Sequence, residues 1–207
     1  STDAHSALSD SIMTAKVLSI VKKKQPYTWE SFFKTANKSD TETIIKKGEI
    51  ITLNEYYYGK SRLHLVAPLH QKYCMHPIYA GWYYAFDLRI DIEPLLNLSI
   101  NEIKVEMKKS PKFLRTIRSN KAPIIVDAKY GMKAEPYSAM DKSLINKRAD
   151  IVKNNEKFSQ NILHALREVA EEKEQSKTQE DIYAEESIYT KFTSNKDTAL
   201  FLSLIHI

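Results

Sequence analysis

The chain has 207 residues, of which 43% are hydrophobic, and this is enough to bury a core, so a fibrous or disordered protein is excluded. The formal net charge is +5, no run of about 18 apolar residues occurs, and the N-terminal segment does not read as a signal peptide, so we expect a cytoplasmic protein without a membrane span. The single Cys74 has no partner for a disulfide or a cysteine metal cluster and is interpreted as a buried structural thiol.

A helix is predicted over residues 4–24. Its apolar residues recur at steps of three and four positions and are Leu8, Ile12, Ala15, Leu18 and Val21. The three lysines at 22–24 complement the negative end of the helix dipole, and Pro26 stops the helix. A second, short helix is predicted over residues 28–34, and the polar residues 35–43 are predicted to form a linker.

Short runs typical of β-strands follow between residues 49 and 126. The runs are EIITLNEYYYG, LHLVAPL, IYAGWYYAFDLRI and APIIVDA, with breaks at Gly59, Pro68, Pro77 and Asn120. Such spacing predicts a small, strongly bent barrel or sheet.

Three more helices are predicted. The first lies inside the β-rich region at residues 101–109, where Ser99 is placed to cap the helix and Ile103 and Met107 share a face. The other two cover residues 138–153 and 157–173.

The charge is distributed unevenly along the chain. Residues 104–121 hold seven basic residues against one acid, whereas residues 168–186 hold eight acids against two lysines. The first segment suits phosphate groups and the second does not. An ordinary solvated basic face has the same composition, so charge alone leaves nucleic-acid binding open.

One local motif carries chemistry: His5 and Asp10 form a His-x4-Asp pair that leads into the first predicted helix. In a two-metal nuclease a carboxylate binds the divalent ions and a nearby His deprotonates the attacking water. Five residues along a helix rotate one side chain by about 140° from the other, so His5 and Asp10 flank one site only if His5 lies on the loop before the helix. Taken alone, such a pair is more commonly a capping or core-edge His beside a solvated Asp.

The surrounding sequence AHSALSDSIMTAKVLSIVKKKQP resembles the third motif and following helix of the DEDDh exonucleases, and of the exonuclease I family in particular. Four further segments follow in the order found in that family. They are VAPL at 66–69, FDLRIDIEPLLNL at 86–98, SNKAPIIV at 119–126 and IYTKFTSNKDTALF near the end. Ser6 stands where the family often has Asp.

The resemblance implies an α+β chain. It consists of the C-terminal end of an RNase H-like exonuclease domain (residues 1–35), an SH3-like β-barrel domain with helical additions that binds DNA (44–190), and the start of a helical C-terminal domain (191–201). Residues 202–207 resemble a translated sequencing adapter and are predicted to be non-native. The absence of Met at the start adds to the expectation that both ends are truncated.

The resemblance also assigns roles. His5 matches the general base and Asp10 the third metal-binding carboxylate, with Mg²⁺ as the expected ion in the full-length enzyme. The family's Asp-x-Glu pair and one further Asp should lie upstream of Ser1. The parent protein is therefore expected to be a 3′→5′ exodeoxyribonuclease of DNA repair that degrades single-stranded DNA to mononucleotides, and this fragment alone is expected to be inactive.

In the middle region we predict contacts to single-stranded DNA. Cations should follow the backbone and aromatic faces should stack with bases. The predicted cations are Lys60, Arg62, Arg115, Arg118 and Lys121, and the aromatic runs are Tyr56-Tyr57-Tyr58 and Trp82-Tyr83-Tyr84. Alternate residues of a strand point to opposite faces, so at least half of these aromatic residues should belong to the core.

The family further implies contact with single-strand DNA-binding protein, and we expect a monomer. Three evenly spaced histidines, His64, His70 and His76, fit no usual zinc pattern, so no zinc site is predicted. Two alternatives remain open. One is another DEDDh nuclease that acts on RNA or proofreads DNA synthesis, and the other is a non-catalytic module that binds nucleic acid or protein.

Overall fold

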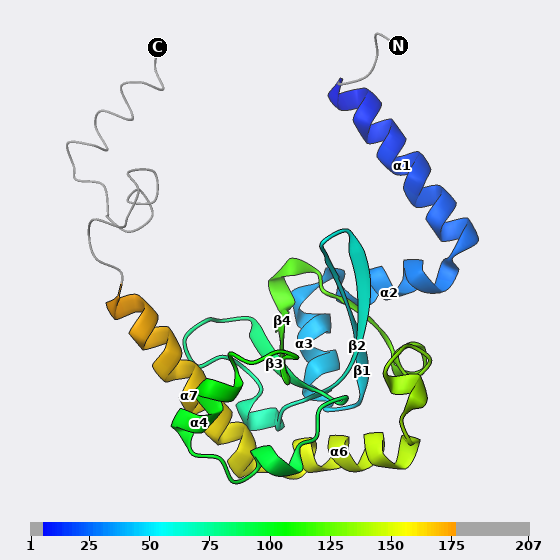
Figure 1. Ribbon diagram of the computed structural model, residues 1–207. Helices are drawn as coiled ribbons and strands as arrows, with labels where there is room; N and C mark the ends of the chain where they lie inside the picture. Colours follow the sequence, from blue (N-terminus) through cyan, green and yellow to red (C-terminus); the bar gives the residue numbers. More distant parts are fainter. Residues whose placement is uncertain (1–5, 177–207) are drawn as a thin grey trace, which may run out of the picture. The chain divides into compact units, whose positions relative to one another are not determined.

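The computed structural model of the chain describes residues 6–176, and Figure 1 shows their helices and strands. The chain divides into two compact units, Ser1–Arg167 and Glu168–Ile207. The helices are α1 (Ala7–Lys24), α2 (Pro26–Ala36), α3 (Lys38–Lys46), α4 (Ile100–Glu106), α5 (Ala128–Gly131), α6 (Lys142–Asn154) and α7 (Glu156–Gln175). The strands are β1 (Ile51–Tyr57), β2 (Lys60–Pro68), β3 (Trp82–Asp87), β4 (Leu114–Arg118) and β5 (Ile124–Asp127).

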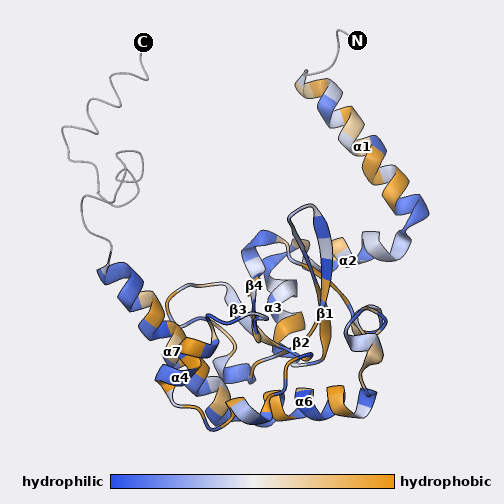
Figure 2. Ribbon diagram, viewed as in Figure 1, coloured by the Kyte–Doolittle hydropathy of each residue, from blue (hydrophilic) through white to orange (hydrophobic). Residues whose placement is uncertain are grey.

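The first predicted helix is confirmed as α1. Its N-cap is Ser6, whose Oγ accepts a hydrogen bond from the backbone N–H of Ser9 at 3.1 Å, and the break before α2 precedes Pro26 as expected. No residue of α1 is buried. Figure 2 shows apolar residues along its length, so the periodic pattern predicted the helix but not a buried face.

The predicted linker over residues 35–43 is wrong, because α3 occupies most of it. Asn37 caps this helix by accepting a hydrogen bond from Ser39 N–H at 2.8 Å. Thr41 and Ile45 are buried on its inner face. Polar residues had suggested a linker, but a buried threonine hydroxyl is satisfied here by backbone carbonyls of Thr35 and Asn37.

All five strands form one antiparallel sheet in the order β4-β3-β2-β1-β5. The α+β class is confirmed, and the strand arrangement fits the predicted SH3-like barrel without establishing it. Four strands overlap the predicted runs, although β2 begins before its run, at Lys60. The fifth, β4, was missed because arginines interrupt its apolar residues, although Arg115 and Ile117 are buried and alternate with less buried neighbours.

The β1–β2 hairpin extends beyond the rest of the sheet (Figure 1). The two strands pair from Ile51↔Val66 to Tyr57↔Lys60, whereas β3 pairs with β2 only from Val66 to Pro68. The outer half of the hairpin is therefore a two-stranded ribbon. Such a ribbon is marginally stable by itself.

The hydrophobic core lies at the opposite end of β2. Phe86 of β3 and Phe158 of α7 are at most 1% exposed, and their ring centroids lie 6.2 Å apart. Ile145 brings α6 into the same core, and α6 lies against β2. This apolar packing fixes the deep end of the strand from which the hairpin projects.

The remaining helix predictions are confirmed in type. Ser99 caps α4 through a capping box with Glu102. Helix α6 begins later than predicted, at Lys142, because Asp141 caps it and residues 137–139 form a 3₁₀ turn. Within residues 6–176, none of the helices is both long and apolar enough to cross a membrane. The predicted domain boundaries stay predictions, and residues 191–207 lie outside the described part of the chain.

Candidate nucleic-acid interface

The predicted nuclease motif lies at the edge of the described chain. Asp10 is exposed in the first turn of α1, and His5 lies outside the described residues. Residues 6–176 contain no group of three or more His, Cys, Asp or Glu side chains that is arranged to hold a metal ion. The roles assigned to His5 and Asp10 therefore stay predictions.

The histidines near Cys74 have separate structural roles. The ring of His70 accepts a hydrogen bond from Lys72 N–H at 3.4 Å, and that of His76 accepts from Ile78 and Tyr79 N–H, each at 3.0 Å. Cys74 is 1% exposed and its thiol donates to a backbone carbonyl, while burial raises the pKa of the thiol. The interpretation of Cys74 as a buried thiol is confirmed.

The tip of the β1–β2 hairpin presents aromatic rings to solvent. Tyr56 is 73% exposed and Tyr58 is 94% exposed. Tyr58 and Gly59 both have positive φ, 52° and 72°, as the mirror-image turns of two-residue hairpins require. Tyrosine is an unusual residue for this conformation, which costs a side chain with a Cβ about 1–2 kcal/mol. Lys60 follows directly and is exposed as well.

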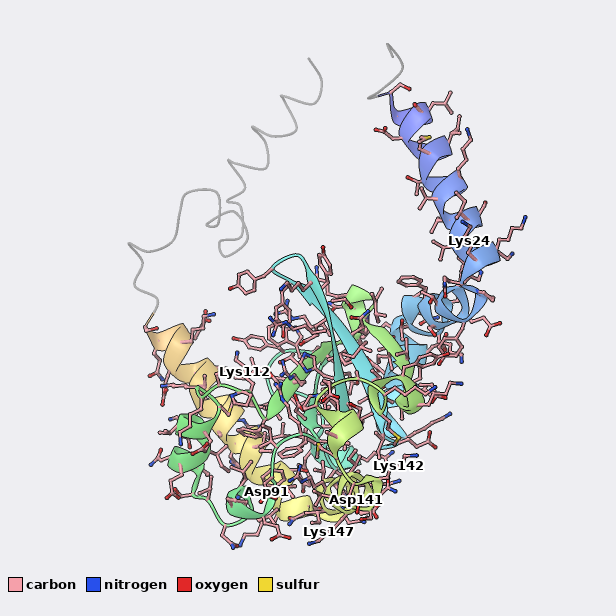
Figure 3. The ribbon with its side chains drawn as sticks, turned by 45° about the vertical axis from the view of Figure 1, so that its right-hand side comes forward. Lys24, Asp91, Lys112, Asp141, Lys142 and Lys147 are labelled. Atoms are coloured by element: carbon pink, nitrogen blue, oxygen red, sulfur yellow. The ribbon has the colours of Figure 1, made fainter. Side chains whose placement is uncertain are left out.

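A cleft of about 730 Å³ lies at the base of this tip and is called the hairpin cleft here. Arg62 lies over the ring of Tyr57, with 5.0 Å between its guanidinium carbon and the ring centroid. Lys112 reaches the same cleft, and Figure 3 shows it well apart from Lys142 on α6. The lining residues are Glu55, Tyr57, Tyr58, Arg62, Arg89, Ser110, Pro111, Lys112, Leu114, Arg115 and Thr116.

A second cleft, of about 330 Å³, adjoins the first, because Glu55 and Thr116 line both. We call it the seam cleft, since its walls come from the two edge strands β4 and β5 and from β1. Arg118 stacks on the ring of Trp82 at 4.1 Å, and Lys121 lies nearby in the wall. The full lining is Leu53, Asn54, Glu55, Thr116, Arg118, Lys121, Pro123 and Ile124.

The predicted cations thus do not lie in one row. Arg62 lines the hairpin cleft, Arg118 and Lys121 line the seam cleft, and Lys60 lies at the hairpin tip. All four of these side chains belong to exposed residues. The two clefts and the tip form one continuous candidate surface that carries cations throughout and aromatic rings at its hairpin end.

Arg115 differs from the other predicted cations, because it is only 8% exposed and both of its neighbours are acidic. Its Nη2 lies 3.0 Å from Asp87 Oδ2, and its Nη1 lies 3.2 Å from Glu55 Oε2. Arg115 is therefore ion-paired beneath the hairpin cleft, where it links the two-stranded part of the hairpin to β3 and β4. Its position favours a structural role over a direct phosphate contact.

The aromatic runs divide between surface and core. Tyr83 and Tyr84 are buried, and burial raises the pKa of each to about 12. Tyr56 and Tyr58 are exposed. The expectation that at least half of these six aromatic residues belong to the core is wrong, because two of them, Tyr83 and Tyr84, are buried. Both lie on the inner strand β3, whereas the hairpin with the first run projects from the sheet.

Sequence reasoning missed the acidic side of this site. Asp87 is fully buried and accepts hydrogen bonds from Arg115 and, at 2.6 Å, from the hydroxyl of Tyr137. Burial opposes the ionisation of Asp87, but the hydrogen bonds from His64 and Tyr137 and the charges of Arg89 and Arg115 outweigh it and lower its pKa. The sequence feature that could have indicated this buried acid is the Asp at the end of the apolar run WYYAFD.

Sequence comparisons give two similar proteins, while no protein-family model matches the chain. Exodeoxyribonuclease I of Buchnera aphidicola is 27% identical over 175 residues, which cover 77% of this chain and 40% of that protein. Exodeoxyribonuclease I of Haemophilus influenzae is 29% identical over 143 residues, which cover 61% of this chain and 29% of that protein. The predicted relationship to exodeoxyribonuclease I is confirmed.

Solved structures of exonuclease I share the fold at 18% identity. The metal-free complex of the Escherichia coli enzyme with single-stranded DNA has a TM-score of 0.69 and matches 97% of this chain and 44% of that one. The zinc-bound form of that complex has a TM-score of 0.66, with 99% and 44% matched. A complex described as ExoI/SSB-Ct has a TM-score of 0.65, with 98% and 43% matched. The chain spans less than half the length of each protein.

Proposed function

We propose that this chain is part of a 3′→5′ exodeoxyribonuclease that degrades single-stranded DNA to mononucleotides, and that residues 44–176 guide the DNA strand. The observation that carries the proposal is the surface formed by the hairpin cleft, the seam cleft and the hairpin tip. Its cations suit a phosphate backbone and its exposed tyrosines suit bases, which is the combination that single-strand binding needs. The relatedness to exodeoxyribonuclease I supports the same substrate.

We assign the hydrolytic step to residues near the start of the chain. Asp10 is the proposed ligand for a divalent ion, with Mg²⁺ as our choice, and His5 is the proposed base for the attacking water. Divalent ions, when bound, supply positive charge that stabilises the phosphoryl transition state. One carboxylate cannot hold two such ions, so we expect this chain alone to be inactive. The zinc-bound form of the similar enzyme supports the use of a divalent metal.

The partner we propose, besides DNA, is the C-terminal segment of single-strand DNA-binding protein. The ExoI/SSB-Ct structure supports this choice, and a positive surface attracts an acidic tail. We further propose that the protein acts as a cytoplasmic monomer in DNA repair. The other DEDDh nucleases that the His-x4-Asp motif allows receive no support from the two similar sequences, which are both exodeoxyribonuclease I.

The guiding role is tested by the affinity of the purified chain for fluorescent single-stranded and double-stranded oligonucleotides over a salt series. We expect tighter binding of the single strand, with an affinity that falls as salt rises. Arg62→Ala should reduce the steepness of the plot of log K against log salt by about 0.7, the value for one lost phosphate contact on a single strand. Arg118→Ala should have a similar effect.

Lys142→Ala is the matched control, because Lys142 lies on α6 and lines neither cleft (Figure 3). It should leave the salt dependence unchanged. Equal losses in Arg62→Ala and Lys142→Ala would mean that only net charge matters, and the proposed surface would then be wrong.

A further inference from the structure

His64 lies where strand β2 passes from exposed to buried residues, and both of its ring nitrogens face acidic oxygens. Nε2 lies 3.2 Å from Glu55 Oε2, and Nδ1 lies 3.4 Å from Asp87 Oδ2. The side chain of His64 is 5% exposed. Only the doubly protonated ring can donate from both nitrogens at once, so this arrangement is that of a buried imidazolium between two carboxylates.

Charged and titratable groups surround His64 on every side. Arg115 bonds to the same two carboxylates, and Arg89 Nε lies 3.1 Å from Asp87 Oδ2. The groups that face this cluster are Glu55 and Tyr57 from β1, Asp87 and Arg89 at the end of β3, Arg115 from β4, and Glu135 and Tyr137 from the segment before α6. Glu55 and Asp87 together balance Arg89 and Arg115, so protonation of His64 gives the cluster one positive charge.

The environment favours the charged form of His64. Burial lowers its pKa, but the hydrogen bonds to Asp87 and Glu55 outweigh this and raise the pKa above 6.5. Glu55 shows the reciprocal effect, because burial raises its pKa but the hydrogen bond from His64 and the charge of Arg115 lower it further. Both shifts favour a protonated His64 beside an ionised Glu55.

A second partner is available to the same ring nitrogen. The hydroxyl of Tyr57 lies 3.4 Å from His64 Nε2, and the ring of Tyr57 carries the guanidinium of Arg62. When Nε2 holds a proton it donates to Glu55, whereas an unprotonated Nε2 accepts from the Tyr57 hydroxyl. The protonation state of His64 therefore selects which neighbour the ring binds.

We propose that His64 is a positioning residue for single-stranded DNA, which couples the protonation of the buried cluster to the phosphate-binding state of the Tyr57–Arg62 stack. With His64 protonated, the Tyr57 hydroxyl is free to donate to a phosphate and one more positive charge lies beneath the cleft. With His64 neutral, that hydroxyl is held by the ring and the charge is gone. The inference rests on the proposed function, since its ligand is the DNA backbone.

The test is the affinity of the full chain for a fluorescent oligothymidylate between pH 5.5 and 8.5 at constant ionic strength. We expect affinity to fall about fivefold as pH rises through the titration of His64, the lower end of the usual range for coupled sites. His64→Gln cannot titrate and should give a flat profile. His164→Gln, which changes an exposed histidine of α7, should keep the profile of the unmodified chain.

A second pair of variants keeps His64 and guards against a folding defect. Tyr57→Phe removes only the hydroxyl and should reduce the pH dependence, while Tyr130→Phe, which changes an exposed tyrosine of α5 that lines neither cleft, should not. In parallel, the imidazole signals of His64 and the ring signals of Tyr57 are followed by NMR without DNA. Both should shift over the same pH range, and the Tyr57 shift should be absent in His64→Gln.

The outcomes separate the two proposals. Binding with the same pH profile in the unmodified chain, His64→Gln and Tyr57→Phe overturns the positioning role and leaves the DNA-guiding role intact. No binding of single-stranded DNA at any pH, together with coupled NMR shifts of His64 and Tyr57, overturns the proposed function and with it the assignment of DNA as the ligand.

Discussion

The two halves of strand β2 differ in burial and in strand pairing. Residues from Lys60 to Arg62 are exposed and pair only with β1, whereas residues from His64 to Pro68 are buried. Figure 2 shows the corresponding change from hydrophilic to hydrophobic residues along the hairpin strands. The deep half is held by apolar packing that excludes water. The outer half has no such apolar packing. The ion cluster at its base stabilises it instead.

This difference indicates that the deep half contributes to stability and the outer half to the proposed binding of DNA. The deep half can change little without loss of the core, because interiors are packed to the density of organic crystals. The hairpin turn beside the outer half carries an exposed tyrosine, Tyr58, in a left-handed conformation, a feature that stability alone does not select. Three substitutions sharpen or break this contrast: one in the core around the deep half, one in the ion cluster at the boundary and one in the hairpin turn.

The largest change in the free energy of unfolding is expected in the core around the deep half. Phe158→Ala removes a ring that is 1% exposed and packs near Phe86. It should lower the free energy of unfolding by about 3–5 kcal/mol, the usual range for a buried phenylalanine. Urea unfolding followed by circular dichroism measures this change. The matched control is Phe33→Ala, because Phe33 is 59% exposed and its loss should cost less than about 1 kcal/mol.

At the boundary, Asp87→Asn should lower the free energy of unfolding by about 3 kcal/mol at neutral pH, because it leaves Arg115 and His64 buried with one shared carboxylate, Glu55, in place of two. Asp150→Asn, on the exposed face of α6, is the control and should stay within about 0.5 kcal/mol. A loss no larger than that of the control would show that the cluster does not hold the ribbon in place.

The same variant tests the pH dependence of stability. The pKa values of Asp87 and Glu55 are lowered on folding, so their contribution is present above about pH 4 and is lost as pH falls through the folded values. The pKa of His64 is raised, so its contribution is present below about pH 6.5 and is lost as pH rises through the folded value. Stability should therefore peak between these limits, and Asp87→Asn should flatten the acid side of the profile.

The smallest change in stability is expected at the tip, where Tyr58→Asn should raise the free energy of unfolding by about 0.5 kcal/mol, because Asn-Gly is the preferred pair in this turn. The same variant should weaken binding of single-stranded DNA by about 1–3 kcal/mol through the loss of one base stack. Thermal unfolding and fluorescence anisotropy measure the two effects. If binding is unchanged, Tyr58 is not a stacking residue.

Much of the fold was open to sequence reasoning, because it depends on local rules. Neighbouring residues determine the apolar period of α1 and the caps of α1 and α4. They also determine the runs that form β1, β2, β3 and β5. Helix α3 and strand β4 were missed for opposite reasons. The polar residues of α3 hide a buried face, and the arginines of β4 hide an alternation whose charge is balanced by residues distant in the chain.

Sequence reasoning identified only part of the candidate site. Lys60, Arg62, Arg118 and Lys121 were found as exposed cations, but nothing in the sequence distinguished them from Arg115, which is buried. The distinction depends on Asp87 and Glu55, which lie 28 and 60 residues from Arg115 along the chain. Pairing over such distances is set by strand register, and no local pattern encodes it.

The sequence by itself determined most of the element types, the mixed α+β class, the similarity to exodeoxyribonuclease I and the residue types suited to a DNA backbone. Only the tertiary structure decided which cations face solvent, that two clefts adjoin at Glu55 and Thr116, and that His64 lies between two carboxylates. The physical reason is that helix period and strand alternation act between near neighbours, whereas burial and ion pairing depend on which strands the bent sheet brings together.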